Sequence, residues 1–130
     1  MEKNLKGFKI LIVDDEADLR EILSEDFALQ GAEVLTAKNG REAYDLALRE
    51  SPHVILSDVR MPGGDGVELL KRIRAVNAKT PPHIFLLTGF SDLQPEQAEA
   101  LGSQGLVSKP FSLKQLRERV VTALKPPIVS

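Results

Sequence analysis

Short apolar runs alternate with amphipathic segments along almost the whole chain, and this alternation restricts the possible folds more than any other feature. The runs lie at 9–15, 33–38, 53–58, 84–88 and 105–109. Runs that are apolar at successive positions are typical of strands buried on both faces of a sheet. No hairpin signal joins one run to the next, so the strands are expected to pair in parallel.

The segments between the runs predict helices. Residues 16–30 carry apolar side chains at helical spacing, and Gly31 follows at the position where a helix commonly ends. Three further helices begin with capping boxes, in which two polar residues three positions apart bond to the backbone at the helix start. These boxes are Asn39 with Glu42, Asp65 with Glu68, and Ser112 with Gln115. The segment 91–102 is only weakly helical, and Pro95 suits the first turn of a helix there.

Five strands that alternate with five helices predict a doubly wound α/β fold. Crossovers between parallel strands are right-handed, so the helices should cover both faces of one sheet. A chain of 130 residues is the size of a single domain. In open sheets of this kind, ligands bind beyond the carboxyl ends of the strands, where the strand order reverses. A functional site is therefore expected at the ends of the predicted strands.

Composition excludes several classes of protein. Hydrophobic residues make up 42% of the chain and charged residues 28%, which is ordinary for a soluble globular domain. The net charge is -2 with acids and bases interleaved, so no basic surface is expected to bind nucleic acid or an anionic membrane. The absence of cysteine excludes disulfides and thiolate chemistry. Residues 1–8 contain no signal peptide, so a cytoplasmic location with protein partners is expected.

Polar residues follow four of the predicted strands at one edge of the sheet. Asp14 and Asp15 end the first run, Asp58 ends the third, Thr88 the fourth and Lys109 the fifth. Any one of them could simply be a polar residue where a strand meets water. Three carboxylates in one place repel one another, however, and an unrelieved cluster raises their pKa values and lowers stability. A divalent cation such as Mg2+ is therefore expected, because together with Lys109 it would balance the charge of the three acids.

These residue types suit phosphoryl transfer. That reaction needs mainly in-line positioning and neutralisation of charge, and a carboxylate can accept the phosphoryl group covalently. Four motifs carry the residues in order: 13–16 (Val-Asp-Asp-Glu), 58–66 (Asp-Val-Arg-Met-Pro-Gly-Gly-Asp-Gly), 87–89 (Leu-Thr-Gly) and 109–111 (Lys-Pro-Phe). With these motifs the sequence strongly resembles response regulator receiver domains, the phosphoacceptor domains of two-component signal transduction.

The resemblance extends over about residues 7–125 and has consequences for the fold. It implies a flavodoxin-like sheet with the strand order 2-1-3-4-5. Residues 1–8 would form an N-terminal extension, residues 9–125 the receiver domain, and residues 126–130 a frayed tail.

The resemblance also implies roles for the acids. Asp58 would accept a phosphoryl group from a histidine kinase or a histidine phosphotransfer protein. Mg2+ (or Mn2+) would be bound directly by Asp15, by Asp58 and by the backbone carbonyl of Arg60. Asp14 would act on the ion mainly through water.

The residues that would respond to phosphorylation follow from the same resemblance. Thr88 and Lys109 would each bind a phosphoryl oxygen, and the peptide bond before Pro110 would be cis. Movement of Thr88 would shift the predicted helix over 91–102. The surface formed by that helix, the strand over 105–109 and the last helix would then change and control a partner or an output domain.

One departure from the family pattern concerns this switch. The position three residues before Lys109 is usually aromatic in the family, but here it is Leu106, which has no polar ring tip. Phe90 could take over this role, or it could be a partly exposed loop aromatic. Whether the chain acts alone, forms a dimer on phosphorylation, or is the receiver part of a longer protein stays open at this stage.

Two other functions share the fold or the chemistry. A Mg2+-dependent aspartyl-phosphate phosphatase of the haloacid dehalogenase class needs an Asp-x-Asp motif, and residues 58–60 read Asp-Val-Arg. A flavodoxin-like electron carrier needs a hydroxyl-rich phosphate loop after the first strand, where this chain has acids. Neither fits as well as a receiver domain. Chemistry beyond Mg2+-assisted self-phosphorylation and self-dephosphorylation is therefore not expected.

Overall fold

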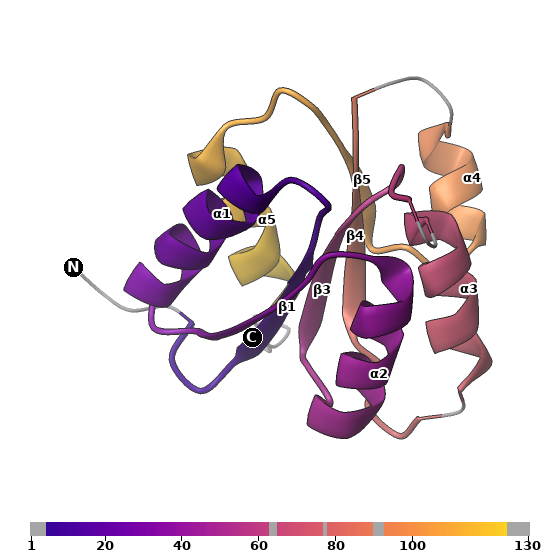
Figure 1. The fold of residues 1–130 in the computed structure, drawn as a ribbon, viewed down its shortest axis with the longest axis horizontal. Helices are drawn as coiled ribbons and strands as arrows, with labels where there is room; N and C mark the ends of the chain where they lie inside the picture. The colour runs from indigo at the N-terminus through magenta and orange to yellow at the C-terminus, as the bar shows by residue number, and fades with distance from the viewer. Residues whose placement is uncertain (1–4, 63–64, 77, 90–92, 125–130) are drawn as a thin grey trace, which may run out of the picture.

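A parallel sheet of five strands forms the middle of the protein (Figure 1). The computed structural model describes residues 5–62, 65–76, 78–89 and 93–124. Its strands are β1 (Lys9–Val13), β2 (Glu33–Ala37), β3 (Val54–Asp58), β4 (His83–Thr88) and β5 (Gly105–Ser108). They lie in the order β2-β1-β3-β4-β5 and every neighbouring pair is parallel. The predicted fold class and strand order are confirmed.

Helices cover both faces of the sheet. They are α1 (Ala17–Leu29), α2 (Gly40–Glu50), α3 (Gly66–Ala75), α4 (Pro95–Ala100) and α5 (Leu113–Leu124). Figure 1 shows α1 and α5 on one face, and α2, α3 and α4 on the other. Two layers of buried side chains result. One joins the sheet to Leu23, Phe27, Leu116 and Val120 of α1 and α5, and the other to residues of α2, α3 and α4 such as Ala43, Leu70 and Ala98.

The helix starts show why the chain turns where it does. Asn39 accepts a hydrogen bond from the Glu42 backbone N–H at 2.9 Å, and Asp65 does the same for Glu68 at 2.8 Å. Each bond satisfies a backbone donor that the first turn of the helix leaves unpaired. The predicted capping positions therefore do begin α2 and α3.

Helix α4 is shorter than the predicted segment 91–102. It begins at Pro95, whose fixed φ suits a first turn. It ends before Gly102, which has a φ of +95° and so stops the helix in the left-handed region. The result is a helix of six residues, too short to be stable without its tertiary contacts.

The predicted N-terminal extension is partly packed onto the domain. Leu5 is fully buried in the layer beneath α1 and α5, and its backbone N–H donates to the Gln30 carbonyl at 2.9 Å. The predicted tail 126–130 lies outside the described residues. Among the residues that are described, no helix has both the length and the apolar character needed to cross a membrane.

The order of the strands determines where the site lies. Strand β1 lies between β2 and β3. The chain passes from β1 to β2 on one side and then crosses back to β3 on the other, so the strand order reverses between β1 and β3. The last residue of β1, Val13, pairs with Ser57 of β3. The residues that follow Val13 and Ser57 therefore meet at the carboxyl edge of the sheet, as expected for a ligand site in such a fold.

Candidate functional site

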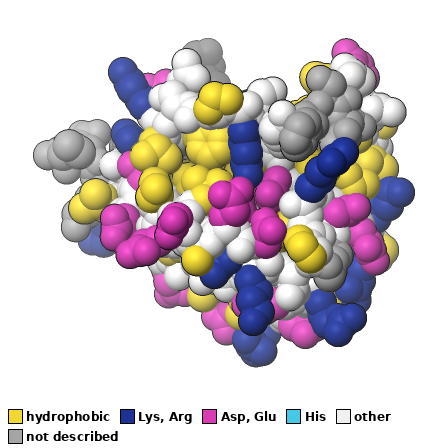
Figure 2. All heavy atoms as spheres, turned by 45° about the horizontal axis from the view of Figure 1, so that its top comes forward, with side chains coloured by type: hydrophobic (Ala, Val, Ile, Leu, Met, Phe, Trp, Pro, Cys, Tyr) yellow, Lys and Arg dark blue, Asp and Glu magenta, His cyan; other side chains and the backbone are white. Residues whose placement is uncertain are grey.

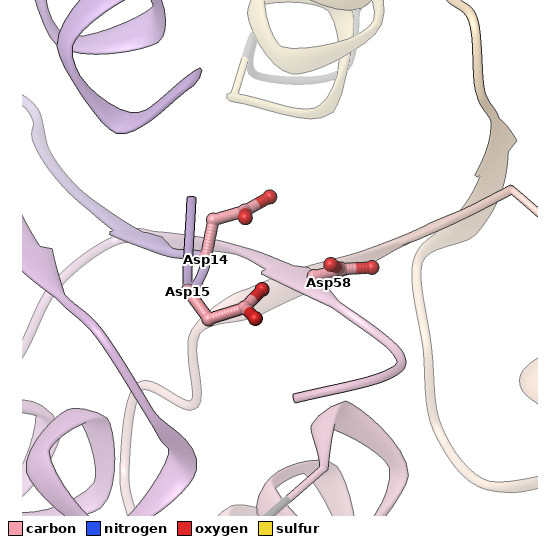
Figure 3. A group of neighbouring side chains, drawn as sticks. All are labelled: Asp14, Asp15 and Asp58. Atoms are coloured by element: carbon pink, nitrogen blue, oxygen red, sulfur yellow. The ribbon is translucent and has the colours of Figure 1, made fainter. Parts of the chain in front are cut away.

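Three carboxylates meet at this edge. Asp14 and Asp15 follow β1, which ends at Val13 and not at Asp15 as the sequence predicted, and Asp58 is the last residue of β3. One carboxylate oxygen from each of the three lies within 4.8 Å of the other two. Figure 3 shows the three side chains extending from the ends of β1 and β3 into the same space. The predicted convergence of these acids is what the structure shows.

Asp14 is fully buried. Its Oδ1 accepts a hydrogen bond from the Glu16 backbone N–H at 2.8 Å, and its Oδ2 lies 3.3 Å from Lys109 Nζ. Both of its carboxylate oxygens are thus engaged by protein groups. Asp15, by contrast, is exposed. The two neighbouring acids therefore differ in how readily they could contact an ion directly.

Lys109 supplies the positive charge of the cluster. Its Nζ lies 3.3 Å from Asp14 Oδ2 and 3.3 Å from Asp58 Oδ2. The residue follows β5, its backbone N–H donates to the Thr88 carbonyl at 2.7 Å, and its peptide bond to Pro110 is cis, as the family resemblance implied. Burial alone would lower the pKa of Lys109, but the carboxylates of Asp14 and Asp58 outweigh burial and raise it.

Asp58 is the acid whose ionisation the site disfavours. Its pKa is raised above the ordinary 3.8, mainly by burial, against which Lys109 acts; the negative charges of Asp14 and Asp15 raise it further. Lysine alone therefore does not neutralise the cluster. Carboxylate oxygens are the donors that Mg2+ prefers, and an added divalent charge would relieve the repulsion, so these residues fit such an ion.

In the absence of metal, Asp58→Asn is expected to stabilise the fold by about 1 kcal/mol at neutral pH. An acid with a raised folded-state pKa loses its proton first in the unfolded chain, so ionisation favours unfolding. The free energy of unfolding of the wild-type protein should therefore fall as pH rises from 3.8 through the raised pKa of Asp58. Urea unfolding in EDTA at several pH values tests this. The variant should be more stable than wild type only at pH values above that window. A constant difference in the free energy of unfolding at all pH values would contradict the prediction.

Figure 2 shows the face that carries the site, with the top of Figure 1 turned forward. Acidic side chains gather in the middle of this face, with basic and apolar side chains beside them. One neighbouring groove lies between the start of α1 and the segment after β5. It is lined by Glu16, Asp18, Leu19, Ile22, Lys109, Pro110, Phe111 and Leu113.

Gly66 is a residue of the site that lies in one of the sequence motifs but was not predicted to have a role. A Cβ on Gly66 would collide with the backbone carbonyl of Asp58 and would also press on Ser57 Oγ. The first residue of α3 therefore lies directly against the backbone of Asp58, and its N–H donates to the Val59 carbonyl at 2.9 Å. The eight-residue spacing from Asp58 to a glycine was the signal in the sequence.

We expect Gly66→Ala to destabilise the protein by about 2 kcal/mol, because the backbone of Asp58 cannot move away without disturbing β3. Gly89→Ala is a matched control, since among the described residues a Cβ there would meet nothing closer than Lys109 Cβ at 3.9 Å. That control should change the free energy of unfolding by less than about 0.5 kcal/mol. Urea denaturation measures both variants. Equal effects of the two substitutions would show that the close approach at Gly66 has no special cost.

The remaining predicted residues lie around the cluster. Thr88 ends β4, is buried, and lines a cavity of about 360 Å³ with Leu93, Leu106 and Lys109 among others. Leu106 is partly buried against the layer that contains α4. Arg60 is exposed two residues beyond Asp58. The predicted alternative switch residue, Phe90, lies outside the described residues.

Fold and cluster together define a class: an α/β domain with the strand order 2-1-3-4-5 that gathers three acids and a lysine at the carboxyl edge of its sheet. The family model described as response regulator receiver domain matches residues 10–121. The chain belongs to this family, whose members are receiver domains of two-component systems.

Related proteins and a solved structure agree with this family assignment. The chain is 42% identical over 118 residues to regulatory protein AtoC of Escherichia coli, covering 90% of this chain and 25% of that protein. It is 34% identical over 113 residues to sporulation initiation phosphotransferase F of Bacillus subtilis, covering 86% of this chain and 90% of that protein. The structure of response regulator TrrA from Thermotoga maritima, in complex with Mg2+ and BeF, matches with a TM-score of 0.80 and 33% identity, covering 90% of this chain and 99% of that one. The chain thus spans about a quarter of AtoC.

Proposed function

We propose that Asp58 accepts a phosphoryl group from a histidine kinase or a histidine phosphotransfer protein, and that this modification changes the surface of α4, β5 and α5. The observation that carries the proposal is the position of the Asp58 carboxylate. It lies within 4.8 Å of oxygens from Asp14 and Asp15 and 3.3 Å from Lys109 Nζ. A carboxylate among charges that can neutralise a phosphoryl group is what covalent transfer requires.

A divalent ion, Mg2+ or Mn2+, would be held by Asp15, Asp58 and the backbone carbonyl of Arg60. The ion would supply charge neutralisation for the transferring group. Asp14 would act through water, because both of its oxygens already accept contacts from Glu16 and Lys109. The similar structure of TrrA from Thermotoga maritima is a complex with Mg2+ and BeF, which supports the assignment by family.

The transfer itself is a displacement at phosphorus. An oxygen of Asp58 forms a bond to phosphorus while the donor's bond to phosphorus breaks, and the donor's histidine nitrogen leaves with the electron pair. Lys109 would pair with one phosphoryl oxygen and the Thr88 hydroxyl would bond another. Both residues lie at the ends of neighbouring strands, since Lys109 N–H donates to the Thr88 carbonyl.

The response would begin at Thr88. The cavity beside it is lined by Leu93 and Gln94, which precede α4, by Pro95 at its start, and by Leu106 from β5. Movement of Thr88 toward a phosphoryl group would change the space available to these side chains. Helix α4 is the element most easily displaced, because six residues form few helical hydrogen bonds of their own. In this chain Leu106 would take the place of the usual aromatic ring.

The partners and the output of the domain are also part of the proposal. Phosphorylation could act on a separate protein, on a second copy of the chain, or on an output domain, and the matched region is about a quarter of AtoC. A cytoplasmic location and the absence of direct nucleic-acid contact by this domain are part of the proposal. Receiver domains are signalling domains, and membership of this family disfavours the phosphatase alternative. We propose no catalytic activity beyond self-phosphorylation and self-dephosphorylation.

Wild-type protein incubated with acetyl phosphate and Mg2+ is expected to gain the mass of one phosphoryl group, as measured by intact-protein mass spectrometry. Acetyl phosphate is a sufficient donor because the acceptor site supplies the charges that the transfer needs. Chelation of the metal by EDTA should suppress the gain. The proposal fails if no mass is gained with Mg2+, and the metal's part in it fails if the gain is equally fast in EDTA.

A further inference from the structure

Arg20 contacts the backbone between the two neighbouring acids. It lies in α1 and is partly buried, and its Nη1 donates to the backbone carbonyl of Asp14 at 2.6 Å. That carbonyl belongs to the peptide bond that joins Asp14 to Asp15. A charge-assisted hydrogen bond to it fixes the plane of this peptide. The plane in turn sets the direction in which the Asp15 side chain leaves the backbone.

The turn before α1 is held through Asp14, because the helix has no side-chain cap of its own. Glu16 is the N-cap residue but makes no side-chain capping bond. Instead the Asp14 carboxylate accepts the Glu16 backbone N–H at 2.8 Å, and the Asp14 backbone N–H donates to the Ala37 carbonyl at 3.2 Å. Asp14 is thus held at its N–H, its carboxylate and its carbonyl. Asp15 is exposed, and the peptide bond that carries the Asp14 carbonyl joins Asp15 to this anchored residue.

We infer that Arg20 is a positioning residue for Asp15, and that it sets the affinity of the site for a divalent ion through the Asp14–Asp15 peptide. The inference rests on the proposed function, in which Asp15 is a direct metal ligand. Groups that orient metal ligands typically change the affinity for the ion by about 10-fold to 100-fold when they are removed.

The sign of the effect separates this role from a purely electrostatic one. Arg20 is a cation beside an acidic cluster, so its charge alone opposes the binding of another cation. Loss of that charge would tighten Mg2+ binding if charge were its whole contribution. Loss of the hydrogen bond to the Asp14 carbonyl would instead weaken Mg2+ binding, because Asp15 would no longer be oriented.

The test is the dissociation constant for Mg2+, measured by calorimetry or by amide shifts in NMR titrations. Arg20→Gln removes the charge and shortens the reach, and should weaken Mg2+ binding about tenfold. Arg20→Lys keeps the charge and one donor, and should recover about half of that loss on a logarithmic scale. If Arg20→Gln does not fold, Arg20→Lys alone must still bind Mg2+ at least about twofold more weakly than wild type.

Arg117→Gln is a matched control. Arg117 makes two charge-assisted contacts, at 3.1 Å each, with Asp26 in the later part of α1, and its replacement by Gln changes the net charge by the same amount. This variant should bind Mg2+ within about twofold of wild type. Unchanged or tighter binding in Arg20→Gln, or equal weakening in Arg117→Gln, would overturn the inference. If wild type itself binds no Mg2+, the proposed function fails first and the assignment of Arg20 fails with it.

Discussion

Asp58→Asn is expected to abolish phosphorylation by acetyl phosphate in the presence of Mg2+. The amide has nearly the shape of the carboxylate, so the fold of β3 and its packing should persist. It lacks the anionic oxygen that would bond to phosphorus. Intact-protein mass spectrometry should therefore show no added phosphoryl group under conditions that modify wild type completely.

Asp45→Asn controls for a general effect of removing an acid. Asp45 is exposed on α2 and lies outside the carboxylate cluster, so this variant should be phosphorylated at the wild-type rate. Equal phosphorylation of Asp58→Asn and wild type would show that another residue accepts the phosphoryl group. Amide shifts in α4 provide a second readout, because the proposed response should disappear together with the modification.

Much of this site could be predicted because local sequence signals show, to within two residues, where β1 and β3 end. The apolar runs before Asp14 and Asp58 are buried strands, and parallel pairing brings their carboxyl ends together without further information. The helix starts were equally local, since Asn39 and Asp65 bond to residues only three positions away. The strand order came from resemblance to the family, because periodicity determines the class of fold but not which strands are neighbours.

Other features depend on contacts that no local pattern encodes. In the sequence, nothing distinguishes Arg20 from other polar residues of the predicted helix. Its guanidinium meets the Asp14 carbonyl only in the folded protein. Leu5 is buried because it packs into the layer formed by α1 and α5. The sequence placed Leu5 in an N-terminal extension and did not predict this packing. Helix α4 is another example, because the weak helical pattern over 91–102 did not show that the helix would begin at Pro95 and end before Gly102.

Lys109→Met is expected to be the most destabilising substitution in the site, with a cost of about 3 kcal/mol in the metal-free protein. Asp14 is fully buried, and Lys109 is the cation 3.3 Å from its Oδ2 and from Asp58 Oδ2. Without Lys109 the site keeps three carboxylates and loses the charge that partly offsets them. Urea unfolding in EDTA measures the cost. Lys114→Met, at an exposed position on α5, should cost less than about 0.5 kcal/mol.

Two further measurements identify the cause as charge. Asp14→Asn in the Lys109→Met background should restore much of the lost stability, because it removes the carboxylate that is left buried and unpaired. Saturating Mg2+ should stabilise Lys109→Met by more than it stabilises wild type, since an added cation relieves a larger excess of negative charge. If Asp14→Asn instead adds its own cost to that of Lys109→Met, packing of the lysine stem and not its charge explains the loss. The positive charge of Lys109 would then not be what allows the acidic cluster to form.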